Sequence, residues 1–196
     1  MTTTHHTLTG PLPFPEPRLT DGEVTLRPWR HADTPARFTA FLDELCLRFS
    51  YPHDGTPSQA QVAALIETDE QARLDGIELN LAIVDASNPD DIWGAASVYD
   101  VNPARRSAAV GYWLASHARG RGAATRTLRL LAAWAFDDLG VQRLELTSAP
   151  DNIPSHAVAQ RCGFRREGTL RSHLPFKGRR RDTVVFSLLP GELTNS

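Results

Sequence analysis

Apolar and polar residues alternate over residues 23–27, near the start of the chain, which is the pattern of a half-buried strand, and Pro28 ends it. Residues 31–47 carry their apolar side chains at helical spacing instead. Those side chains are Phe38, Phe41, Leu42 and Leu45. With Asp33 as a candidate N-cap, this pattern predicts one helix over the whole stretch.

A second helix is predicted to begin at Ser58, because Ser58 and Gln61 have the spacing of a capping box, and to end at Gly76. After Gly76 the apolar period changes to two. Three stretches have this period, namely residues 79–83, 92–99 and 109–114, with Asn-Pro turn signals between them. Three strands with short connections predict an antiparallel meander.

A strong helical pattern covers residues 121–139, and Gly140 follows it. Its apolar stripe consists of Ala124, Leu128, Leu131 and Ala135. The remaining pattern predicts a strand over residues 142–147, a short helix over 154–161, and two strands around Arg171 and over 184–188. This mixed order of elements predicts an α+β (mixed α/β) fold.

Residues 1–18 are rich in Thr and Pro, with prolines at alternate positions from 11 to 17. Alternating prolines prevent a helix and remove hydrogen-bond donors from a strand, so we expect an extended N-terminal arm. The remainder, residues 19–196, is expected to form a single domain.

The composition is that of an ordinary soluble domain, with a formal net charge of -2 and 41% hydrophobic residues. This charge gives no reason to expect nucleic-acid binding. Cys46 and Cys162 are too few for a disulfide framework or a metal site, and we expect no metal. No apolar run is long enough to span a membrane, and residues 1–10 lack the apolar region of a signal peptide, so we expect a cytoplasmic protein.

A turn rich in glycine and arginine joins the strand predicted over 109–114 to the helix predicted over 121–139. Its central residues are Arg119, Gly120, Arg121 and Gly122. Glycines let the backbone approach a ligand, and the free N–H groups at the start of a helix attract anions. The turn therefore predicts a ligand that carries phosphate, although a solvated surface turn would show the same residues.

Two familiar phosphate-binding patterns fit this turn poorly. A P-loop is excluded because no Gly-Lys-Ser/Thr follows. The pair Gly120-x-Gly122, with Glu145 about twenty residues on, resembles a dinucleotide-binding fingerprint. However, Thr125 stands in place of the third glycine and a meander precedes the turn, so a dinucleotide-dependent enzyme is the weaker hypothesis.

The segment Arg119-x-x-Gly122-x-Ala124 resembles the Q/R-x-x-G-x-G/A motif with which GNAT acetyltransferases bind the pyrophosphate of acyl-CoA. The preceding Gly-Tyr-Trp-Leu at 111–114 is similar to the RimJ/RimL-type branch of that family. So is the later run that contains Asn152, Ser155 and Gly163-Phe164. The resemblance covers roughly residues 19–189.

The resemblance implies a central, mostly antiparallel twisted sheet of about six to seven strands, with helices on both faces. It also implies a V-shaped splay between the fourth and fifth strands, and acetyl-CoA (or another acyl-CoA) as co-substrate. The implied pantetheine contacts are Trp113, Leu114, Ala115 and Asn152. The implied pyrophosphate contacts are Arg119, Gly120, Arg121, Gly122, Ala123, Ala124 and Thr125.

Many members of the family protonate the departing thiolate with a Tyr seven residues after the motif Asn, but that position is Ala159 here. RimJ/RimL-type enzymes use the motif Ser, which implies Ser155 as the catalytic acid and a further cofactor contact. Alternatively, Ser155 merely caps the short helix. The usual Glu base is replaced by Ala109. The remaining candidates for the base are Asp100, Glu145, His53, Asp54 and His173, or water alone.

The leading hypothesis is an N-acetyltransferase that acts on the primary amine of a protein N-terminus or of a small molecule. A non-catalytic acyl-CoA-binding module, or a transferase for a longer acyl group such as succinyl, is the alternative. We expect no nucleic-acid or membrane partner, and a homodimer is compatible with this branch of the family.

Overall fold

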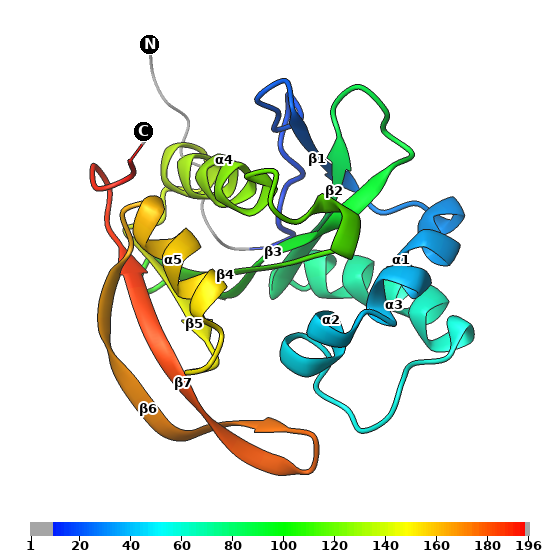
Figure 1. The fold of residues 1–196 in the computed structure, drawn as a ribbon. Helices are drawn as coiled ribbons and strands as arrows, with labels where there is room; N and C mark the ends of the chain where they lie inside the picture. The colour runs from blue at the N-terminus through cyan, green and yellow to red at the C-terminus, as the bar shows by residue number, and fades with distance from the viewer. Residues whose placement is uncertain (1–9, 195–196) are drawn as a thin grey trace.

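The computed structural model describes residues 10–194 and contains one seven-stranded sheet in the order β1-β2-β3-β4-β5-β7-β6 (Figure 1). The strands are β1 (Val24–Pro28), β2 (Glu78–Asp85), β3 (Ile92–Asn102), β4 (Ser107–Leu114), β5 (Arg143–Ser148), β6 (Arg165–Phe176) and β7 (Arg179–Leu188). The helices are α1 (Thr34–Phe41), α2 (Glu44–Phe49), α3 (Gln59–Leu74), α4 (Ala123–Asp137) and α5 (Ile153–Arg161). The predicted fold class is confirmed.

Helices cover both faces of the sheet, with α4 packed on β1, β3 and β4, and α3 packed on β2 (Figure 1). The predicted meander is confirmed, because β1 to β4 pair in sequence order and antiparallel. Alternate side chains of β2, such as Leu81 and Ile83, pack with Leu128 and Leu131 of α4 in the main core. In residues 10–194 no helix is long and apolar enough to cross a membrane.

The prediction of one helix over residues 31–47 is wrong. This stretch contains a short 3-10 turn (His31–Asp33), α1 and α2. The helix is interrupted between Phe41 and Glu44. Asp43 causes the break, since its carboxylate accepts the N–H groups of Leu45 (3.0 Å) and Cys46 (3.2 Å) as the N-cap of α2. Leu42 and Leu45, expected in the apolar stripe, are exposed.

Residues 10–18 belong to the folded unit, although the sequence suggested a separate arm up to residue 18. Leu12 is fully buried in the main core, and its N–H donates to the carbonyl of Arg73 in α3 (2.9 Å). The guanidinium of Arg73 returns a hydrogen bond to the Leu12 carbonyl (2.8 Å) and lies over the ring of Phe14. Residues 1–9 of the expected arm lie outside the described residues.

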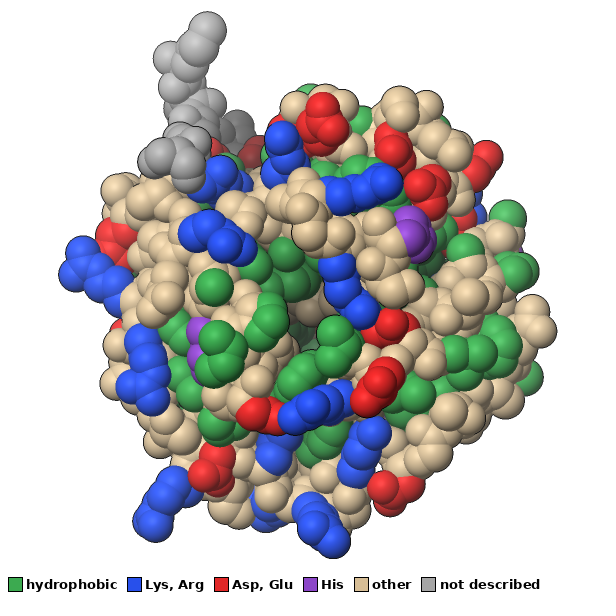
Figure 2. All heavy atoms as spheres, in the orientation of Figure 1, with side chains coloured by type: hydrophobic (Ala, Val, Ile, Leu, Met, Phe, Trp, Pro, Cys, Tyr) green, Lys and Arg blue, Asp and Glu red, His purple; other side chains and the backbone are tan. Residues whose placement is uncertain are grey.

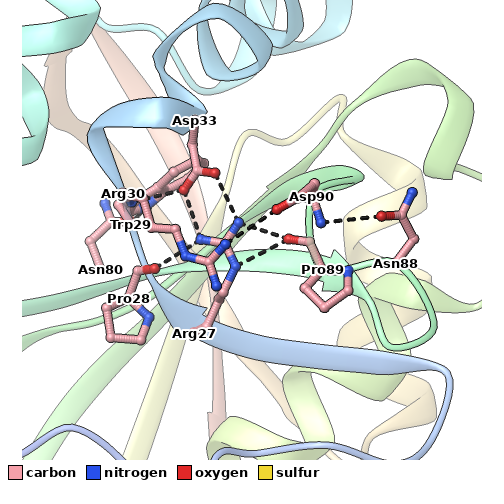
Figure 3. Close-up of polar contacts among 9 residues, drawn as sticks. All are labelled: Arg27, Pro28, Trp29, Arg30, Asp33, Asn80, Asn88, Pro89 and Asp90. Atoms are coloured by element: carbon pink, nitrogen blue, oxygen red, sulfur yellow. Dashed lines mark hydrogen bonds and ion pairs between the residues drawn. The ribbon is translucent and has the colours of Figure 1, made fainter.

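A buried ion pair joins β1 to the start of α1 and to the turn between β2 and β3 (Figure 3). Arg27 donates to both carboxylate oxygens of Asp33 (2.7 and 2.9 Å) and to the carbonyl of Pro89 (2.8 Å). The Arg30 N–H adds a hydrogen bond to Asp33 (2.8 Å). Burial alone would raise the pKa of Asp33, but these hydrogen bonds outweigh it and the pKa is lowered. The Asp33 carboxylate therefore accepts from Arg27 and makes no capping hydrogen bond with α1. The sequence had suggested that Asp33 caps this helix.

Replacement of Arg27 should be strongly destabilising, because it leaves the Asp33 carboxylate buried without its partner. We expect Arg27→Ala to lower the free energy of unfolding by about 3–5 kcal/mol. The exposed pair between Arg30 and Asp90 is the matched control, and Arg30→Ala should cost less than about 1 kcal/mol. Urea unfolding of the two variants measures both losses, and equal losses would contradict this account.

Candidate functional site

The parallel pairing of β4 and β5 is short. It joins Ser107, Ala108 and Ala109 to residues 143–145, and β4 then continues to Leu114 without β5 as its neighbour. The two strands therefore diverge toward their carboxyl ends, which confirms the predicted splay (Figure 1). A cavity of about 1450 Å³ lies at this divergence, and Figure 2 shows the surface hollowed near the centre of this face.

The turn between β4 and α4 forms one side of the cavity. Gly120 and Gly122 have φ values of +76° and +79°, a left-handed backbone that favours glycine. Gly122 is the N-cap of α4, and the first hydrogen bond of the helix runs from Arg126 N–H to its carbonyl. Among the described residues nothing accepts the N–H groups of residues 123–125. Residues 123–125 line the cavity, and free N–H groups at the start of a helix attract anions.

Four arginines that the sequence analysis did not single out also line this cavity, namely Arg48 of α2 and three others. Arg126 and Arg129 lie three residues apart on α4, and Arg161 ends α5. Arg126 is paired with Asp21 (2.6 Å), and Arg129 donates to the carbonyl of Arg161 (3.4 Å). The spacing of Arg126 and Arg129 directly after the glycine-rich turn is the sequence signal that could have identified them.

The Arg119 side chain binds Asp43 at the start of α2, whereas the sequence analysis predicted that Arg119 contacts pyrophosphate. It makes a two-pronged ion pair with Asp43 and donates to the Leu114 carbonyl (2.9 Å). The hydrogen bonds from Arg119 are the main cause of the lowered pKa of Asp43. Arg119 still lines the cavity, but it anchors the start of α2 to the turn that precedes α4.

The cavity is lined by all the predicted cofactor contacts except Ala115 and Arg121. The N–H of Ala115 donates to the Trp93 carbonyl (2.8 Å), so this donor is already used within the protein. The guanidinium of Arg121 lies over the ring of the same Trp93, 5.5 Å from its centre. Both residues therefore contact Trp93 of β3 and attach the turn to that strand.

Asn152 and Ser155 come from the start of α5, on the other arm of the splay. Asn152 is the N-cap of α5, since its Oδ1 accepts the N–H of Ser155 (3.4 Å). Within residues 10–194 the hydroxyl of Ser155 makes no capping bond of its own. Tyr112 of β4 instead donates its phenol to Ser155 Oγ (3.4 Å). The sequence analysis did not identify this contact of Tyr112, because no motif indicates a contact between β4 and α5.

The five candidates for a general base lie outside the lining of this cavity. Glu145 is paired with Arg143 (2.9 Å), and His173 is hydrogen-bonded to Thr183 (2.7 Å). His53 packs against Tyr51 in the loop after α2, which also contains Asp54, and Asp100 is exposed at the far end of β3. Glu145 is nevertheless the strand neighbour of Ala109 in the β4–β5 pair, so one of the five candidates lies beside the position of the usual base.

An aromatic cluster lies on the face of β4 opposite the side chain of Tyr112. The ring of Trp113 lies 5.0 Å from that of Phe41 in α1, which in turn packs on Tyr51. The turn between β6 and β7 reaches this region, because the N–H of Lys177 donates to the Pro52 carbonyl (2.7 Å). Tyr112 and Trp113 are neighbours on one strand, so they face opposite sides of the sheet.

The comparisons with known proteins agree with this geometry. YdaF of Bacillus subtilis (strain 168), named as a candidate ribosomal N-acetyltransferase, is 36% identical over 123 residues. That match covers 63% of this chain and 64% of YdaF, so it spans less than two thirds of that relative.

Mycobacterium smegmatis RimJ, solved in complex with CoA-disulfide, has a TM-score of 0.78 at 29% identity and covers 91% of this chain and 88% of RimJ. The ribosomal-protein-serine acetyltransferase of Escherichia coli (strain K12) is 30% identical over 82 residues, which are 42% of this chain and 46% of that protein. The family described as acetyltransferase (GNAT) domain matches residues 23–165, and the chain belongs to this family.

Proposed function

We propose that this protein transfers an acetyl group from acetyl-CoA to the α-amino group at the N-terminus of a protein. The cavity between β4 and β5 carries this proposal, because the start of α4 and the Ser155 hydroxyl meet in it from the two arms of the splay. Its volume of about 1450 Å³ exceeds the roughly 300–1,000 Å³ of typical small-molecule pockets and suits a ligand as long as acyl-CoA.

The charge of the lining fits the anionic part of acyl-CoA. Five arginines and two aspartates line the cavity, namely Arg48, Arg119, Arg126, Arg129, Arg161, Asp21 and Asp151. The N–H groups of residues 123–125 supply further donors toward phosphate oxygens. The side-chain nitrogen of Asn152, which no described residue accepts, can bind a carbonyl of the pantetheine arm.

The reaction needs a neutral amine, stabilisation of the oxyanion and a proton for the departing thiolate. Ser155 is the proposed source of that proton. The thioester C–S bond breaks as the C–N bond forms, the electron pair stays on sulfur, and the Ser155 proton moves to it. The nitrogen loses one proton on becoming an amide, and water carries that proton to Ser155 Oγ, which restores the hydroxyl.

The absence of a carboxylate at Ala109 favours an α-amine as acceptor. An α-amino group has a pKa of about 7.7–8.0, so about a third of it is neutral at pH 7.5, whereas a lysine amine at about 10.4 is neutral to roughly 0.1%. An enzyme without a dedicated base is therefore better suited to a protein N-terminus. The names of the E. coli and B. subtilis relatives, which refer to ribosomal proteins, point to the same class of acceptor.

The substitution Thr125→Asp should weaken the binding of CoA without lowering the stability of the protein. Thr125 lies in the first turn of α4, where a carboxylate favours the helix by about 0.3–1 kcal/mol. The same carboxylate repels pyrophosphate, so the Kd for CoA should rise by at least about tenfold, which is 1.4 kcal/mol. Calorimetric titration with CoA and thermal unfolding measure the two effects. Thr125→Asn is the neutral control, and equal Kd values for both variants would contradict the proposed phosphate site.

Ser155→Ala tests the proposed acid. We expect unchanged CoA affinity and a fall in kcat of about 10²–10⁴, because the thiolate then leaves without its proton. Thiol release from acetyl-CoA in the presence of a peptide with a free N-terminal serine measures kcat. The same peptide with a blocked N-terminus is the control. Unchanged turnover in the variant would remove Ser155 from this role.

The pH dependence tests the proposed acceptor. With the serine peptide, kcat/KM should rise with pH, reach half of its maximum at about pH 8 and level off at about pH 9, as the amine itself becomes neutral around its pKa of about 7.7–8.0. A matched peptide whose only free amine is a lysine should react much more slowly at pH 7.5. A rise that is half complete at about pH 6.5, the pKa of a histidine, would instead reveal a protein base and count against this account.

A further inference from the structure

A pair of hydroxyl groups bridges the two arms of the splay. Tyr112 projects from β4 and Ser155 from the start of α5, and their oxygens are 3.4 Å apart at the cavity. This separation is long for two hydroxyls, but catalytic hydrogen bonds often shorten only when substrate is bound. Apart from this contact, neither hydroxyl has a hydrogen-bond partner among residues 10–194. Each oxygen therefore depends on the other, on solvent and on ligand.

The direction of this hydrogen bond decides where the Ser155 proton points. A serine hydroxyl has one proton and two lone pairs, so it can accept from one side and donate to another. With Tyr112 as the donor, the Ser155 proton is free to point into the cavity. With the direction reversed, the same proton would point at Tyr112 and away from a thiolate.

The surroundings of Tyr112 favour the arrangement in which Tyr112 donates and Ser155 accepts. Burial raises the pKa of its phenol, so the phenol keeps its proton at neutral pH. The ring packs against the main core beside Leu114, which holds the hydroxyl in place. A phenylalanine would fill the same volume, so packing alone does not require the hydroxyl.

We propose that Tyr112 is a positioning residue, which donates to Ser155 Oγ and thereby directs the Ser155 proton at the sulfur of the leaving thiolate. This inference rests on the proposed function of Ser155. Tyr112 keeps its own proton throughout. Ser155 gives one proton to sulfur, and Tyr112 stabilises the charge that develops on Ser155 Oγ until the proton lost by the amine replaces it. A hydrogen bond to a charged group strengthens as this charge develops.

The test is a double-mutant cycle of Tyr112→Phe and Ser155→Ala, assayed with acetyl-CoA and the serine peptide. Tyr112→Phe alone should lower kcat by about five- to tenfold, the worth of one hydrogen bond, and leave the KM for acetyl-CoA unchanged. In the Ser155→Ala background it should have no further effect. A merely structural role would lower kcat equally in both backgrounds.

A second measurement needs no substrate. In the free protein, proton NMR should detect a protected hydroxyl proton that is lost in Tyr112→Phe and that exchanges faster with water in Ser155→Ala. An exchange rate that Ser155→Ala leaves unchanged would overturn the inference, and so would equal kcat losses in the two backgrounds. Full activity of Ser155→Ala would overturn both this inference and the proposed acid, so the two failures are distinguishable.

Discussion

The point at which β4 and β5 stop pairing is the constraint on which the candidate site depends. The two strands are neighbours only as far as Ala109 and Glu145. Beyond these residues β4 stays paired with β3 up to Leu114, and β5 stays paired with β7 up to Ser148. Each strand is therefore held on its outer side, while its inner edge has no neighbouring strand there and, at the Leu114 end of β4, the carbonyl accepts from Arg119 (2.9 Å). An extended ligand can satisfy that edge as an added strand would.

The parallel direction of this pair explains why both helix starts meet at one cavity. The carboxyl ends of parallel strands lie at the same edge of a sheet, and the segments that follow them begin there. β4 leads through its glycine-rich turn to α4, and β5 leads to the Asn152 cap of α5. An antiparallel pair would send these helices to opposite ends of the sheet. The glycine-rich turn and the Ser155 hydroxyl line one cavity because of this one parallel contact.

Local patterns predicted the elements well wherever the determining contact was itself local. The Ser58–Gln61 capping box and the buried stripe of α4 are confirmed. The break at Asp43 is an exception, because its capping bonds with Leu45 and Cys46 are local and the apolar spacing nevertheless ran past it. Burial of Leu12 depends on α3, and the Tyr112–Ser155 contact crosses from one arm of the splay to the other. Spacing along a chain does not encode such long-range partners.

Helix α2 spans the open end of the splay, and its ion pairs with the two arms differ in strength. Asp43 at its start is paired with Arg119, whose side chain is 30% exposed, on the β4 arm. Arg48 near its end is paired with Asp151 on the β5 arm, and both of these side chains are 56% exposed. Exposed pairs contribute about 0–1 kcal/mol, whereas a shielded two-pronged pair contributes more. The ion pair on the β5 side is therefore the weaker of the two, and Arg181 of β7 supplements it with two hydrogen bonds to the Phe49 carbonyl at the end of α2 (3.3 Å each).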